Sequence, residues 1–200
     1  MKRRSLALLV YGNAFIIGMA LMGFEMLGSR YLVPYFGSGI NAWAGLISTV
    51  LCALAFGYFA GGTIVDKFPS PMIMAGAIFW AAGYLMLIPA SADSVMQWIL
   101  DRVGEGPMGI LLASSVLLLV PLSLLGTFSP MAVRLLLQST KETGRTSGLV
   151  YGISTMGNVF GTLFTTFVLI PELGSRAITY VYAGILALCA MSFLFAPKKG

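Results

Sequence analysis

Six long apolar stretches make up most of this 200-residue chain. A helix needs about 20 mainly apolar residues to cross the hydrocarbon core of a bilayer. Hydrophobic residues form 58% of the sequence and charged residues only 10%, whereas about a quarter of a soluble domain is charged. The sequence therefore predicts an all-α integral membrane protein with one six-helix transmembrane domain over residues 1–200. Its predicted helices are residues 5–28, 42–63, 71–91, 107–137, 147–171 and 176–196.

Two parts of the pattern depart from six regular helices. Residues 92–106 form the longest linker, and their apolar members fall at roughly helical spacing around Trp98. This spacing fits a short interfacial helix with Trp98 among the headgroups, and it fits a plain loop equally well. The fourth stretch is too long to cross once in a straight line. We expect kinks at Pro121 and Pro130, because proline removes a backbone hydrogen bond.

The basic residues are distributed unevenly between the two sides of the predicted membrane. If the N-terminus is cytoplasmic, the outer segments hold only Arg30, Arg102 and Arg176, and all other Lys and Arg residues lie inside. Short cytoplasmic loops carry such an excess of basic residues. We therefore expect a multi-pass protein of the inner (plasma) membrane with both termini cytoplasmic. The first stretch is too long for the core of a signal peptide, so we interpret it as a retained helix.

Several classes of function are disfavoured by what the sequence lacks. It has no histidine, and its two cysteines, Cys52 and Cys189, lie inside different apolar stretches, so we expect no metal site. No phosphate-binding glycine loop occurs, and no nucleophile has a plausible base. The net charge of +5 is explained by membrane orientation, so we expect no nucleic-acid partner. We also expect no cofactor and no catalysis within this chain.

An acid lies inside the first apolar stretch. Glu25 falls near its outer end, and Arg30 follows five residues later. Ionisable residues within membrane spans are costly and commonly mark ligand or ion pathways. Glu25 is therefore a candidate ligand for a small cation or a carried proton. The alternative is structural, with Glu25 paired to Arg30 near the interface.

The fifth stretch combines polar side chains with closely spaced glycines. Among the polar residues of this stretch, the amide side chain of Asn158 is the most costly to expose to lipid, so it should face protein or water. A contact with a polar ligand and a hydrogen bond between helices are both compatible with the sequence. Small residues four positions apart let helix backbones approach closely, either for tight packing or in seams that slide during alternating access. The polar residues are Ser154, Thr155, Asn158, Thr162, Thr165 and Thr166, and the glycine pairs are Gly148 with Gly152 and Gly157 with Gly161.

Charged residues follow the cytoplasmic ends of the second and fourth stretches. Asp66 and Lys67 close the second, after the glycines of residues 57–62, and must reach the membrane surface or pair with protein. Arg134 ends the fourth stretch on the same side, and Arg145 precedes the fifth. We interpret Asp66, Lys67, Arg134 and Arg145 as a candidate charge-paired cytoplasmic gate. The alternative for the basic residues is a simple positive-inside anchor.

Two resemblances to known families accompany these motifs. Gly62-x-x-x-Asp66-Lys67 is similar to the loop between the second and third helices of major facilitator transporters, whose halves have six helices each. Nearly the whole chain resembles the membrane domain of the fused major-facilitator/spermidine-synthase-like proteins. The resembling positions are, in order, residues 25–37, Trp43, residues 57–67 and 126–134, Gly144-Arg145, Gly148, Tyr151, residues 154–158, Gly161-Thr162, residues 169–171 and residues 174–176.

The second resemblance implies a connection with polyamines. In that family the membrane region is joined to, or encoded with, a soluble aminopropyltransferase-like domain. The glycine-rich, acid-containing site for the aminopropyl donor is not found among these 200 residues, so the enzymatic half of the family's activity is not expected here.

We therefore expect a transporter-like protein for a small organic cation, such as a polyamine. It would work as a homodimer in the lipid bilayer and associate with a soluble spermidine-synthase-like (aminopropyltransferase-like) partner. One alternative is a non-transporting scaffold that docks a synthase-like enzyme, and another is a membrane-embedded enzyme acting on lipid. The candidate substrate-binding residues are Glu25, Arg30, Trp43, Ser154, Thr155 and Asn158.

Overall fold

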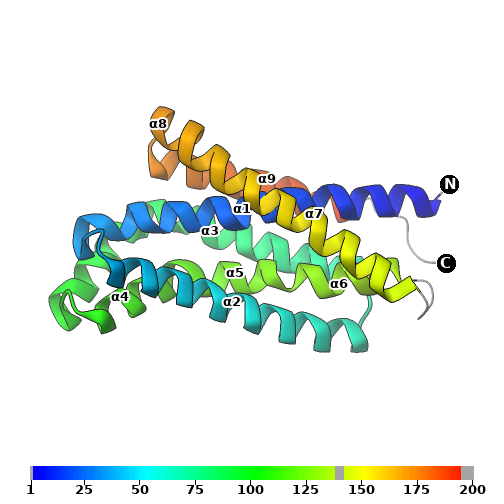
Figure 1. The fold of residues 1–200 in the computed structure, drawn as a ribbon, viewed down its shortest axis with the longest axis horizontal. Helices are drawn as coiled ribbons and strands as arrows, with labels where there is room; N and C mark the ends of the chain where they lie inside the picture. Colours follow the sequence, from blue (N-terminus) through cyan, green and yellow to red (C-terminus); the bar gives the residue numbers. More distant parts are fainter. Residues whose placement is uncertain (1, 138–141, 195–200) are drawn as a thin grey trace.

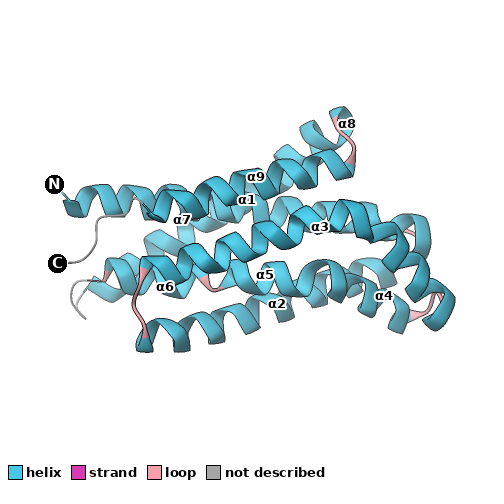
Figure 2. Cartoon of the chain, turned by 180° about the vertical axis from the view of Figure 1, so that it is seen from behind, coloured by secondary structure: helices cyan, strands magenta, loops and turns pink. Residues whose placement is uncertain are grey.

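The computed structural model describes residues 2–137 and 142–194, and within these ranges the chain is helical with no strand (Figure 1, Figure 2). Six helical spans are long and apolar enough to cross a membrane, which confirms the prediction of an all-α membrane protein. Spans 1 to 3 are single helices: α1 (Lys2–Phe36), α2 (Ile40–Lys67) and α3 (Pro71–Val103). Span 4 comprises α4 (Pro107–Ser114), the π-helical η1 (Ser115–Leu119), α5 (Val120–Gly126) and α6 (Phe128–Leu136). Span 5 comprises α7 (Thr143–Phe164), the π-helical η3 (Thr165–Leu169) and α8 (Ile170–Glu172), and span 6 is α9 (Ser175–Leu194).

Several helices are longer than the sequence predicts. Span 1 does not end near residue 28 but continues to Phe36, where Gly37 takes a positive φ of 73°. Both interpretations of residues 92–106 are wrong, because α3 continues to Val103 and ends at Gly104, whose φ is 86°. The buried Met96 and Ile99 extend the packed face of α3 through this segment. The predicted end of the sixth helix, residue 196, lies outside the described residues.

Prolines in spans 4 and 5 follow wide π turns. The segment η1 ends two residues before Pro121, and η3 ends two residues before Pro171. A π turn is a local widening of a helix and leaves some backbone groups without their usual helical partners. The hydroxyl of Tyr84 in α3 donates to the carbonyl of Val116 in η1 at 2.5 Å. Neighbouring spans therefore help to support these irregular segments.

The helices pair in a two-fold pattern. Span 1 packs along span 5, span 2 along span 4, and span 3 along span 6. Exchanging spans 1, 2 and 3 with spans 4, 5 and 6 leaves these pairings unchanged. Spans 1 and 4 cross in opposite directions, so the relation is that of inverted repeats with an axis in the membrane plane. Figure 1 shows this relation in the two ends of the molecule. The last turns of α2 splay away from the bundle at one end, and the α8 region splays away at the other.

The two-fold pattern extends to individual residues. Gly157 and Gly161 of span 5 lie against the backbone of Phe15 and Met19 of span 1, respectively. In the same way, Gly57 and Gly61 of span 2 lie against the backbone of Ser123 and Thr127 of span 4. Gly18 against Ser154 and Gly126 against Leu54 continue the same register. The two halves are therefore related residue by residue along both glycine-lined seams.

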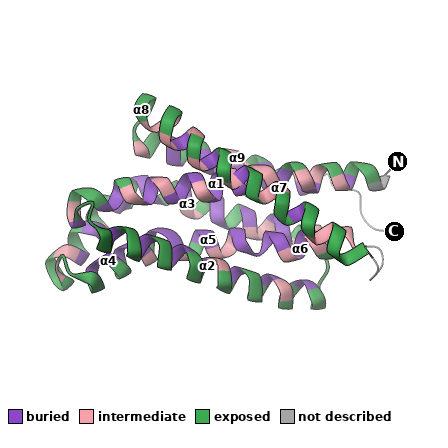
Figure 3. Ribbon diagram, in the orientation of Figure 1, coloured by how far each residue is buried: buried purple, intermediate pink, exposed green. Residues whose placement is uncertain are grey.

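Span 5 is the least buried of the six (Figure 3). In the most apolar 18-residue stretch of each span, 17% is buried for span 5 and 39% to 50% for the other five. Span 5 also has the lowest mean hydropathy. Gly148 and Gly152 of this span have open space around their Cα atoms. A polar, weakly buried helix is a poor fit to pure hydrocarbon.

Candidate functional site

Glu25 is the one buried charged residue in the described part of the chain. The residue is 8% exposed, and its side chain forms no hydrogen bond or ion pair with any described residue. On α1 it lies seven residues after Gly18, which faces α7, and three before Gly28, which contacts Leu46 of α2 and Leu118 of η1. Helical periodicity therefore places Glu25 on the α1 surface between span 5 and spans 2 and 4.

No charged residue of the neighbouring spans forms an ion pair with Glu25 in the described part of the chain. Asp66 and Lys67 lie at the last turn of α2, Arg145 lies in the first turn of α7, and Arg176 is the second residue of α9. Arg30 is exposed and makes no ion pair with Glu25. The structural alternative, a Glu25–Arg30 pair, is therefore not formed. Within the described ranges, the ion pair that does form joins Arg176 to Asp93 of α3.

The other predicted binding residues are not gathered around Glu25. Trp43 lies at the start of α2 and is 39% exposed. The hydroxyl of the exposed Thr155 donates to the Tyr151 carbonyl at 2.8 Å. The Ser154 backbone and the Asn158 side chain lie against Gly18, which is two helical turns, or roughly 10 Å, from Glu25 along α1.

Two hydroxyl residues continue the Asn158 face of span 5 in the direction of Glu25. The Thr162 hydroxyl donates to the Asn158 carbonyl at 2.9 Å. The Thr166 Oγ1 atom is buried and has no hydrogen-bond partner, and the same holds for the Asn158 Oδ1 atom. Sequence reasoning identified these threonines as polar but did not include Thr162 or Thr166 in the predicted site. The repeat of Gly57-x-x-x-Gly61 as Gly157-x-x-x-Gly161 was the signal that could have identified them.

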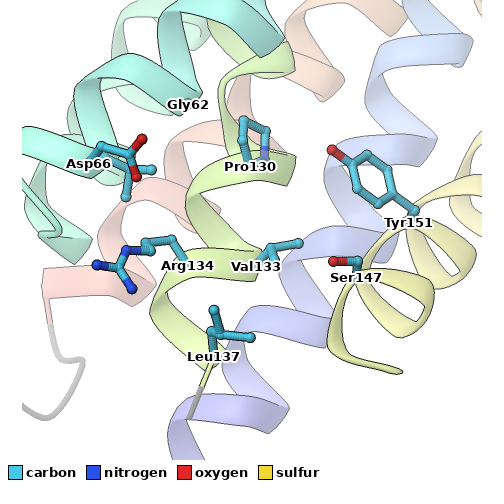
Figure 4. Close-up of a pocket in the computed structure, with 9 residues that line it drawn as sticks. Gly62, Asp66, Pro130, Val133, Arg134, Leu137, Ser147 and Tyr151 are labelled. Atoms are coloured by element: carbon cyan, nitrogen blue, oxygen red, sulfur yellow. The ribbon is translucent and has the colours of Figure 1, made fainter. Parts of the chain in front are cut away.

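A hollow of about 280 Å³ opens where α2, α6 and α7 come together (Figure 4). This is the end of the bundle at which the N-terminus lies (Figure 1). We call this end the N-terminal end. The hollow contains an acid and a base, Asp66 and Arg134, and the hydroxyls of Ser147 and Tyr151, none of which has a side-chain hydrogen bond to another described residue. The residues that line it are Gly62, Val65 and Asp66 of α2, Pro130, Val133 and Arg134 of α6, Leu137, and Ser147 and Tyr151 of α7.

The predicted gate is brought together only in part. Asp66 and Arg134 share the hollow but form no ion pair, so the predicted charge-paired gate is not formed in this conformation. Lys67 and Arg145 are exposed and do not line the hollow. The contact between α2 and α7 is aromatic instead, because the rings of Tyr58 and Tyr151 meet edge to face with centroids 6.3 Å apart.

The described residues contain no group of three His, Cys, Asp or Glu side chains that could hold a metal ion. Cys52 is exposed and Cys189 is buried, and both are free thiols. Comparisons with protein-family models, with characterised proteins and with solved structures find no match to this chain.

Proposed function

We propose that this chain is a transporter-like membrane protein for a small organic cation, such as a polyamine. The observation that carries the proposal is Glu25, a largely buried acidic residue inside a membrane span with no basic partner among the described residues. A buried carboxylate requires a counter-charge or hydrogen-bond donors, because its desolvation is otherwise very costly. A bound organic cation would supply both.

The two-fold relation between spans 1–3 and 4–6 supports a transport role. Inverted repeats of this kind are common in secondary transporters, where the repeats exchange conformations to expose a central site to either side. Glu25 lies on α1, at the contact between the two repeats, because span 1 packs along span 5 of the other repeat. A cation bound there would be placed where such an exchange changes access.

We further propose that the working unit is a homodimer in the bilayer. Span 5 is polar and little buried, and lipid would leave its hydroxyl and amide groups poorly satisfied. Gly148 and Gly152 leave open space on this helix for close approach by another helix. A second copy would cover this face and give twelve helices in total.

The proposed setting is the inner (plasma) membrane, with the N-terminal end of the bundle and both termini in the cytoplasm. The excess of basic residues at that end supports this orientation. A soluble aminopropyltransferase-like partner on the cytoplasmic side would produce or consume the cation. The alternative of a non-transporting scaffold would keep this partner and require no ligand at Glu25.

The proposal is tested by uptake of labelled spermidine into proteoliposomes that contain the purified protein. We expect uptake by the wild type and its loss in Glu25→Gln, which removes the charge and keeps the shape. Glu172→Gln changes an exposed acid in α8 and serves as the matched control, with uptake unchanged. If the wild type takes up no spermidine but retains a soluble synthase-like partner, the transporter proposal is wrong and the scaffold is supported.

A further inference from the structure

We infer that Glu25 binds a primary ammonium group together with the hydroxyl oxygens of Thr162 and Thr166. This inference rests on the proposed function and adds the residues that complete the site and the chemical class of the group they hold. The three side chains come from span 1 and span 5, which belong to different repeats. None of the earlier predicted partners of Glu25 is part of this set.

The two-fold relation between the repeats assigns each residue of spans 1 and 5 a counterpart in spans 4 and 2, and we call this correspondence the two-fold register. It brings Glu25, Thr162 and Thr166 together. It pairs Phe15 with Ser123, Met19 with Thr127, and the glycines of span 5 with those of span 2. Counting onward along the helices pairs Glu25 with Val133, Thr162 with Gly62, and Thr166 with Asp66. Val133, Gly62 and Asp66 line one hollow at the N-terminal end (Figure 4). Glu25, Thr162 and Thr166 are therefore the counterparts of that lining toward the opposite end of the bundle.

Contacts near Glu25 agree with this register independently. Gly23 of α1 lies against the side chain of Thr165, the first residue of η3. Residues 23–25 of α1 and the start of η3 are therefore at the same height in the bundle. Thr166 follows immediately, and its buried Oγ1 atom has no hydrogen-bond partner. The Glu25 carboxyl group, which has no partner among the described residues, and the unpartnered Thr166 oxygen thus lie at the same level of neighbouring spans.

The oxygen atoms in this set match a primary ammonium group. An alkylammonium ion has three N–H donors and one positive charge. The Glu25 carboxylate supplies the negative charge and one acceptor. The Thr162 hydroxyl donates its proton to the Asn158 carbonyl, which leaves its oxygen free to accept, and the Thr166 oxygen is unpartnered. A quaternary ammonium ion has no N–H and would leave both threonine oxygens without donors.

The hollow at the N-terminal end is not an equivalent cation site. There the lining holds one acid, Asp66, and one base, Arg134, so it carries no net charge even though the two side chains form no ion pair. In the two-fold register the counterpart of Arg134 is Met26, which carries no charge. The Glu25 site therefore has one acid and no base, and its carboxylate would balance the charge of a monovalent ammonium group.

The arrangement can be tested without any ligand by cross-linking. Glu25→Cys combined with Thr166→Cys, in a chain with Cys52 and Cys189 replaced by Ser and Ala, should react with a short bis-methanethiosulfonate to give an intramolecular link. The matched control combines Glu25→Cys with Thr155→Cys on the exposed face of α7 and should remain unlinked. Equal linking in both pairs, or none in the first, would overturn the arrangement.

The chemical class is tested by binding of labelled spermidine to the purified protein, with competition by butylamine and butyltrimethylammonium. We expect Thr166→Val and Thr162→Val each to weaken spermidine binding about tenfold, with Thr155→Val unchanged. Butylamine should compete at lower concentration than its trimethylated form. If Glu25→Gln abolishes binding but both valine variants bind normally, this inference fails and the proposed function stands. Absence of binding by the wild type would overturn both.

Discussion

The Cα atom of Gly161 lies so close to the carbonyl oxygen of Met19 that a Cβ atom at residue 161 would overlap that oxygen. The obstacle is backbone, which cannot move aside as the end of a flexible side chain could. Gly61 has the same relation to Thr127 across the other seam. The approach of spans 1 and 5, and of spans 2 and 4, therefore depends on the absence of a side chain at these positions.

We predict that Gly161→Ala destabilises the protein by about 1–3 kcal/mol, the range found for overpacked cores. Gly61→Ala should have a similar effect because its surroundings are related by the two-fold. Gly83→Ala is the control, since Gly83 is exposed on α3 with open space around it, and its effect should stay within about 0.5 kcal/mol. Thermal unfolding of the three variants in one detergent decides the matter. Equal stability of Gly161→Ala and Gly83→Ala would show that the α1–α7 seam is looser than described.

A double-mutant cycle tests whether Asp66 and Arg134 interact. They share the hollow without an ion pair, so we expect a coupling free energy near zero between Asp66→Asn and Arg134→Gln. The cycle of Asp93→Asn with Arg176→Gln is the comparison, because that exposed ion pair is formed and should give about 0.2–1 kcal/mol. A coupling of about 1 kcal/mol or more between Asp66 and Arg134 would support the charge-paired gate instead.

The proposed orientation is tested by labelling with a membrane-impermeant maleimide in intact cells. Single cysteines at Ser38, between α1 and α2, and at Ser70, between α2 and α3, lie at opposite ends of the bundle. In a background without Cys52 and Cys189, Ser38→Cys should react from outside and Ser70→Cys only after the membrane is permeabilised. The reverse pattern would place the N-terminus outside and remove the support for a cytoplasmic partner.

The proposed dimer makes a prediction about which face is covered. Cysteines introduced at Gly152 of α7 in two copies should cross-link in native membranes, because span 5 is the proposed contact face. Gly83→Cys is the control, since Gly83 is exposed on α3 and also has open space. Linking through Gly83 rather than Gly152 would mean that span 5 is covered by something other than a second copy.

The number of spans could be predicted from the sequence because the length and apolarity of a membrane helix are local properties. The glycine faces were also predictable, since Gly57, Gly61, Gly157 and Gly161 recur at helical spacing. The continuation of α3 to Val103 was not, because the polar residues near Asp93 suggested an end. Asp93 is accommodated by its exposed ion pair with Arg176, which comes from a distant part of the chain.

The candidate site was only partly predictable for a similar reason. Glu25 stands out as an acid in an apolar stretch, but its partners depend on the register between spans 1 and 5. That register is set by the backbone contacts of Gly157 and Gly161, which composition does not reveal. Asn158 is the amide residue in the apolar middle of span 5 and so was favoured, yet it lies two turns from Glu25, beside Gly18.

The most direct test of the central proposal is the equilibrium affinity of the purified protein for labelled spermidine, measured for the wild type, Glu25→Gln and Glu25→Asp. Loss of a charge-assisted contact of this kind weakens binding by roughly ten- to a hundredfold. We predict that loss for Glu25→Gln, partial recovery for Glu25→Asp, and an unfolding temperature for Glu25→Gln no lower than that of the wild type. Unchanged affinity in Glu25→Gln, accompanied by a lowered unfolding temperature, would contradict the proposal and make Glu25 a structural residue.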